Sequence, residues 1–146
     1  MNFKMYKEGI GEIFQDIEKE KVKNRKIDIL RAKDNKVLRG MLELAYDNKI
    51  EWALPEGRPP FTPLVKSMDA QGHLYPEMRR MYLYLKGGND NLKPLRREQI
   101  FVRTLEELDC DDAELLLQCK ERKIKGCTKK LVQEAFPDFL NDPANS

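Results

Sequence analysis

The chain has 146 residues, of which 40% are hydrophobic and 36% are charged, and its formal net charge is only +2. A chain of this length fits one domain that folds without a disulfide or a metal ion, and its charge content is typical of amphipathic helices. No apolar run approaches the ~20 residues of a membrane helix, and the first residues lack a signal-peptide pattern, so we expect a cytoplasmic protein without a membrane partner.

Three helices are predicted in the first third of the chain. The first has one apolar face, made by Ile10, Ile13, Phe14 and Ile17. A second, short helix carries Ile27 and Leu30, and a third begins at Asn35, a predicted N-cap. The third helix stacks Val37, Leu38, Met41, Leu42 and Ala45. Because the connections are only a few residues long, we expect these helices to pack as a small antiparallel bundle.

The helical pattern breaks between Leu54 and Pro76. Residues that cannot sustain a helix or a central strand recur there: Pro55, Gly57, Pro59, Pro60, Pro63, Gly72 and Pro76. We predict a long ordered loop at about 54–76, pinned against the bundle by Trp52, Phe61 and Tyr75. Loops of this length are uncommon in compact domains and are often functional, and a structural strap across the core is an equal alternative.

Further helices are predicted in the second half. One covers Glu77 to Lys86 and ends at Gly87-Gly88, a C-cap signal. Another begins near Pro94, which suits a first helical position. Its apolar residues are Leu95, Ile100, Val102, Leu105 and Leu108.

Two more helices complete the chain. Asp111 and Asp112 open the first, which buries Leu115, Leu116, Leu117 and Cys119. Thr128 caps the second, which holds Leu131, Val132 and Ala135 and stops at Phe136-Pro137. We therefore predict an all-α fold, a compact multi-helix bundle over residues 1–141 with a frayed tail at 142–146.

The cysteine and histidine residues argue against metal and disulfide chemistry. Cys110, Cys119 and Cys127 are odd in number and form no C-x-x-C pair, which disfavours disulfide frameworks and zinc fingers. His73 is the only histidine, so a histidine-based triad or metal cluster is hard to build. We predict no cofactor, no metal site and no catalytic residues.

Neither the glycine pair nor the acidic residues change this prediction. Lys86 to Asn89 lacks the spacing of a phosphate loop and ends a helix instead of opening one. The acidic residues match no calcium loop, and helix starts and solvated faces explain most of them: Glu106, Glu107, Asp109, Asp111 and Asp112.

Charge is segregated along the chain, and the stretch from Lys120 to Lys130 is the most informative. A cationic helix end is followed by a turn at Gly126, which would let a phosphate approach the backbone, and by Thr128, which opens a helix whose amide groups attract an anion. Charges that only complement one helix dipole would leave Lys125, Lys129 and Lys130 unexplained. The predicted phosphate-binding residues are Lys120, Arg122, Lys123, Lys125, Gly126, Thr128, Lys129 and Lys130.

A second basic block, from Lys21 to Arg39, is weaker evidence, because helices of soluble proteins often carry lysine on their solvated side. Arg96 and Arg97 oppose the dipole of a predicted helix start, which is easier to understand if an anion meets them, although Glu98 can serve. The predicted secondary binding residues are Lys33, Lys36, Arg39, Arg96 and Arg97.

Two sequence blocks carry a resemblance to a known family. The first joins IFQDIE to RKIDILRAKDNKVLRGMLELAY, between Ile13 and Tyr46, and the second is AELLLQCKERKIKGCTKKLVQEAFP, from Ala113 to Pro137. They resemble the N-terminal helical domain of ATP-dependent DNA ligases of the phage T4 type. The second block is the more specific, because it combines a leucine-rich helix, a basic turn with glycine, a hydroxyl-started helix and a terminal aromatic-proline pair. The chain is also similar to stand-alone proteins of tailed phages.

In such ligases this domain grips the duplex across its minor groove, while separate domains perform the chemistry. The resemblance implies that the residues near the phosphate backbone are Lys123, Lys125, Gly126, Thr128 and Lys129. The chain lacks the K-x-D-G adenylation motif, so we expect no ligation. Asp138 stands where the family usually has glycine, and together with Glu134 and Asp142 it makes that end less favourable for DNA.

We therefore expect a non-catalytic, sequence-tolerant duplex-DNA-binding protein, an accessory of phage replication or repair in the host cytoplasm. The alternative is a phage interaction or regulatory protein that binds a phage or host protein through the proline-rich loop around Trp52 and Phe61 and has lost DNA binding.

Overall fold

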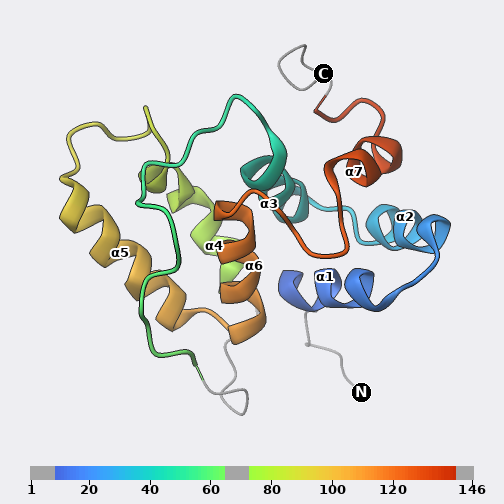
Figure 1. Ribbon diagram of the computed structural model, residues 1–146, viewed down its shortest axis with the longest axis horizontal. Coiled ribbons are helices and arrows are strands. Elements are labelled where there is room, and N and C mark those ends of the chain that lie inside the picture. The colour runs from blue at the N-terminus through green and yellow to red at the C-terminus, as the bar shows by residue number, and fades with distance from the viewer. Residues whose placement is uncertain (1–8, 65–72, 141–146) are drawn as a thin grey trace.

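The computed structural model describes residues 9–64 and 73–140, and this part of the chain is helical without β-strands (Figure 1). Its elements are α1 Ile10–Lys19, α2 Lys23–Ala32, α3 Lys36–Tyr46, α4 Leu74–Glu77, the 3-10 helix η1 Met78–Tyr84, α5 Pro94–Glu107, α6 Cys110–Lys120 and α7 Lys129–Ala135. The all-α prediction is confirmed. None of the described helices is long and apolar enough to cross a membrane. The predicted tail at 142–146 and part of the predicted loop lie outside the described residues.

Helix α6 stands at the centre of the molecule (Figure 1). It buries residues around its whole circumference, including Leu115, Leu116 and Leu117, so it can receive neighbours on more than one side. Both α1 and α3 pack against α6, whereas α2 packs against α7. The predicted bundle of the first three helices is only partly right: α1 contacts α2, but α3 packs chiefly against α6, because short connections do not decide which apolar faces meet.

Side-chain caps fix the beginnings of three helices. Asn35 accepts the Leu38 N–H at 2.8 Å and Thr128 accepts the Leu131 N–H at 3.2 Å, so both predicted N-caps are confirmed. Helix α6 begins one residue earlier than expected, because Asp109 is its N-cap.

Over residues 54–64 the proline-rich segment lies on the core as an irregular strap. Trp52 donates its indole N–H to the Leu44 carbonyl at 3.1 Å and meets the Phe101 ring edge-on, and Phe61 is partly buried against the core. The loop was predicted to end at about Pro76, and α4 begins two residues earlier, at Leu74. Proline is tolerated in a first helical turn, where its missing N–H costs nothing.

The predicted helix from Glu77 to Lys86 is also different in the structure. A 3-10 helix ends at Tyr84, and the chain then becomes extended and pairs with the segment around Trp52. Ala53 N–H donates to Tyr84 O and Lys86 N–H donates to Glu51 O, both at 2.8 Å. These hydrogen bonds take the place of those that the backbone would make in a helix.

Helix α5 begins at Pro94 as predicted, but its predicted apolar face is partly wrong. Phe101, Leu105 and Leu108 are buried, whereas Leu95 is 68% exposed. A helical repeat of about 3.6 residues turns Leu95 away from the face that Phe101 and Leu105 share.

Candidate functional site

The turn between α6 and α7 is anchored from beneath by Tyr46. Its hydroxyl accepts the Ile124 N–H at 2.9 Å and donates to the Cys127 carbonyl at 2.5 Å, and Ile124 and Cys127 form an antiparallel bridge. Burial raises the pKa of Tyr46 to about 12, so the hydroxyl stays protonated as a donor. The turn that sequence reasoning selected is thus a fixed part of the fold.

Gly126 serves the packing of this turn against α1. Its φ is +76°, and a Cβ at this position would lie 2.6 Å from the Cα of Glu18. The packing of the turn therefore requires glycine here, because the backbone of α1 occupies the side that a side chain would take, and an approach of phosphate to Gly126 stays a prediction. The Gly126 carbonyl accepts a hydrogen bond from Lys26 Nζ at 2.8 Å.

Two predicted phosphate ligands are used inside the fold. Arg122 donates to the carbonyls of Leu44 at 2.8 Å and Asp47 at 2.6 Å, where α3 ends. A cation at the carbonyl end of a helix satisfies groups that have no helical partner. Lys120 donates to the Gly57 carbonyl at 2.7 Å and so holds the proline-rich strap. Both side chains thus have contacts within the fold, and their part in phosphate binding stays a prediction.

The predicted secondary residues do not form one surface. Arg97 is 8% exposed and donates to three backbone carbonyls, those of Leu83, Asn89 and Leu92. Arg39 makes two hydrogen bonds to Asp34, at 2.7 and 2.9 Å, and stacks over the ring of Phe136. Both are structural contacts, which corrects their assignment.

The other secondary residues are exposed but occupy two separate places. Arg96 is in the first turn of α5, which lies at the opposite end of the molecule from α2 and α7 (Figure 1). Lys33 and Lys36 lie where α2 ends and α3 begins. The described structure therefore gives no common site for the secondary set.

A groove between α2 and α7 brings the two basic blocks together. It has a volume of about 360 Å³ and is lined by Lys21, Lys23, Lys26, Gly126, Thr128, Lys130, Leu131 and Glu134. We call these residues the basic groove. Four ammonium groups and one carboxylate leave its lining with a formal charge of +3.

Contacts at both ends hold α7 on α2 and so define the walls of the groove. The bond from Lys26 to the Gly126 carbonyl joins the walls before α7 begins. At the other end of α7, Arg31 donates to the carbonyls of Ala135 at 2.9 Å and Glu134 at 3.3 Å. The groove is therefore a preformed feature and does not depend on a ligand to assemble it.

Sequence reasoning found only one wall of this groove. Gly126, Thr128 and Lys130 were predicted site residues, and Lys123 and Lys125 are exposed in the neighbouring turn, while Lys129 is half-buried. The other wall, made by Lys21, Lys23 and Lys26, was not among the predicted site residues. Its signal was the first basic block, but a charge block does not say which of its members face a distant segment.

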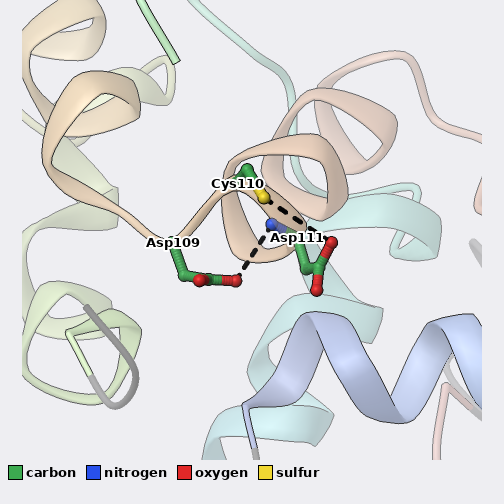
Figure 2. Close-up of side chains that lie close together, drawn as sticks. All are labelled: Asp109, Cys110 and Asp111. Atoms are coloured by element: carbon green, nitrogen blue, oxygen red, sulfur yellow. Dashed lines mark hydrogen bonds between the residues drawn. The ribbon is translucent and has the colours of Figure 1, made fainter. Parts of the chain in front are cut away.

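A second cluster of chemically capable side chains lies at the start of α6 (Figure 2). Ligand atoms of Asp109, Cys110 and Asp111 lie within 4.8 Å of one another, an arrangement that could hold a metal ion. Asp109 accepts the Asp111 N–H at 3.1 Å, and Asp111 accepts a hydrogen bond from Gln15 on α1 at 2.7 Å. These carboxylates thus begin α6 and join it to α1.

Asp112 is the least exposed carboxylate of this region, with 1% of its surface accessible. Its Oδ1 accepts the Gly11 N–H in the first turn of α1 at 2.7 Å, and its Oδ2 has no hydrogen-bond partner. Burial raises the pKa of Asp112 to about 6, and the negative charges of Asp109 and Asp111 add to the rise. Sequence reasoning saw only a helix start here, because α1 and α6 are distant in the chain.

Comparison with known proteins identifies a family. The model of a family of unknown function, DUF6433, matches residues 13–126. No curated protein and no solved structure matches the chain. The matched range contains the α2 wall of the basic groove and stops at Gly126, so α7 lies beyond it.

Proposed function

We propose that this chain, which belongs to the DUF6433 family, is a non-catalytic protein that binds duplex DNA through the basic groove. The observation that carries the proposal is the convergence of Lys21, Lys23 and Lys26 with Lys130 in one groove, although about a hundred residues separate the two walls in the sequence. Cations gathered from two distant segments create a local positive potential that the low net charge of the chain conceals.

The chemistry of the groove suits a phosphate backbone. Lysine is a point charge that binds phosphate without a fixed geometry, so it recognises the backbone and not the base sequence. Lys21 and Lys130 are exposed at the groove, and Lys123 and Lys125 extend the cationic surface into the adjacent turn. We therefore propose that binding tolerates any sequence.

The resemblance to the ligase N-terminal domain adds support. Its first block contains Lys26, and its second block contains Gly126, Thr128 and Lys130, so the two most similar stretches supply residues to both walls of the groove. This resemblance rests on the two sequence blocks alone. It is the basis for proposing an accessory role in phage DNA replication or repair.

The alternative of a protein partner bound through the proline-rich strap has less support. Trp52 and Phe61 pack against the core instead of forming an exposed patch. Arg58 further ties the strap to α6 through hydrogen bonds of 2.8–3.0 Å to Glu114 and Glu121. These contacts favour a structural strap over a docking surface.

Titration of fluorescently labelled duplexes of two unrelated sequences, between about 50 and about 200 mM salt, tests the proposal. With three or four phosphate contacts and ~0.9 released counterions for each, log K against log salt should have a slope of about −2.7 to −3.6. The double variant Lys21→Glu and Lys130→Glu should weaken binding to both sequences and make the slope shallower by about 1.8.

Arg96→Glu is the matched control, because it reverses one exposed charge at the other end of the molecule. It should leave the affinity close to that of the wild type. Binding that is undetectable or independent of salt would contradict the proposal. A loss of affinity in Arg96→Glu as large as that in the double variant would remove the groove as the site.

A further inference from the structure

The basic groove already contains an anion that belongs to the chain itself. Glu134 on α7 forms an ion pair with Lys23 on α2 at 2.7 Å, and both side chains line the groove. Their side chains are 39% and 58% exposed, so a ligand entering the groove meets both of them. A phosphate that approaches Lys23 must therefore displace the carboxylate or share the site with a like charge.

We infer that Glu134 is an internal competitor for the phosphate backbone and sets the threshold for binding in the groove. This inference rests on the proposed function. Because Glu134 neutralises one of the four lysines, a small anion meets a weakened site. A polyanion that contacts Lys21, Lys26 and Lys130 together binds without breaking the ion pair, whereas a small anion at Lys23 must break it, so Glu134 discriminates in favour of an extended backbone.

The backbone of Glu134 is held in place, so this residue cannot leave the groove by a movement of α7. Its backbone carbonyl accepts a hydrogen bond from Arg31, which fixes the end of α7 on α2. Only the half-exposed side chain can turn away from Lys23. Lys26, in contrast, donates to the Gly126 carbonyl, a neutral group, so its charge is not cancelled in the same way.

Salt dependence separates competition from a general charge effect. While Glu134 holds Lys23 in the ion pair, that lysine neutralises no phosphate and releases no counterion from the DNA. The salt slope of the wild type should therefore be near −2.7, from the three other lysines. In Glu134→Gln the ion pair is absent, so Lys23 can neutralise a fourth phosphate and the slope should reach about −3.6.

The experiment compares Glu134→Gln with the wild type on a labelled duplex between about 50 and about 200 mM salt. We expect Glu134→Gln to bind about two- to fivefold more tightly near the upper salt concentration, the range that corresponds to exposed ion pairs. Adding Lys23→Gln to Glu134→Gln should abolish the steeper slope. Unchanged thermal unfolding of each variant establishes that the fold is retained.

Glu51→Gln is the matched control, since Glu51 is an exposed glutamate paired with Lys86 at 3.0 Å, and neither residue lines the basic groove. It changes the net charge equally and should leave the slope unchanged. A wild type that binds DNA while Glu134→Gln has the same slope and affinity overturns the competitor role and leaves the proposed function standing. An equal gain in Glu51→Gln also overturns it. A wild type that does not bind DNA overturns the proposed function itself.

Discussion

Replacing Asp112 by asparagine should remove a pH-dependent loss of stability. The carboxylate is buried, and its Oδ2 has no hydrogen-bond partner, so burial raises its pKa from 3.8 to about 6. A raised acid pKa means that the folded state holds the proton more tightly than the unfolded state. The ionisation penalty is therefore absent below pH 3.8, grows between 3.8 and about 6, and is complete above that range.

The size of this effect follows from the two pKa values. A rise from 3.8 to about 6 corresponds to about 3 kcal/mol, at ~1.36 kcal/mol for each pH unit. Asparagine keeps an oxygen that can accept the Gly11 N–H, but it carries no charge. Its amide group adds a constant cost that does not change with pH. The difference in unfolding free energy between Asp112→Asn and the wild type should thus shift in favour of the variant by about 3 kcal/mol from about pH 3.5 to about pH 7.5.

Urea unfolding at a series of pH values measures this difference directly. Trp52 is the only tryptophan of the chain and lies against Phe101, so its fluorescence reports on the folded core. Other carboxylates titrate in both proteins and largely cancel in the difference. A difference that stays constant with pH would refute the reasoning, because it would mean that the charge of Asp112 costs nothing in the fold.

Three further substitutions test the contacts that hold the site. Gly126→Ala should lower the unfolding free energy in urea by about 1–3 kcal/mol, because an alanine must adopt a φ of +76° and its Cβ would meet α1; an unchanged midpoint would contradict this packing. Arg122→Met should lower the melting temperature through the loss of two charge-assisted hydrogen bonds, each about 1.5–3 kcal/mol, while the folded variant keeps its DNA affinity. Tyr46→Phe should destabilise the protein by about 1–3 kcal/mol, because the buried Ile124 N–H loses its acceptor, and faster amide hydrogen exchange at Ile124 would report it.

The helix faces and caps could be predicted from the sequence, because their causes are local. The spacing of Ile10, Ile13 and Ile17 gives one buried face, and Asn35 and Thr128 cap the helices that follow them. These features depend on residues three or four positions apart.

The pairing of helices could not be predicted, because it depends on contacts between distant segments. Short connections suggested that the first three helices form a bundle. Instead, α1 and α3 pack against α6, which buries residues on several sides. The segment after Tyr84 is extended because its backbone is hydrogen-bonded to Glu51 and Ala53, and no local sequence pattern predicts these bonds.

The positive charge of the candidate site could be predicted from the sequence, but the residues that form the site could not. Arg97 and Arg122 look like free cations in the sequence, yet their guanidinium groups donate to backbone carbonyls. In the sequence, Lys21 and Lys23 look like ordinary solvated lysines. In the fold, α7 lies opposite them and makes them part of a groove. A sequence shows where positive charge is, and only the fold shows whether that charge is already used.

The central claim is that DNA lies in the basic groove between α2 and α7, and backbone amide chemical shifts of the labelled protein titrated with a short duplex test it most directly. The account predicts that the largest shifts occur at residues 21–26 and 126–134, at salt concentrations where binding is observed, and that the first turn of α5 stays unchanged. Shifts confined to α5 or to the proline-rich strap, with none at the groove, would contradict the account.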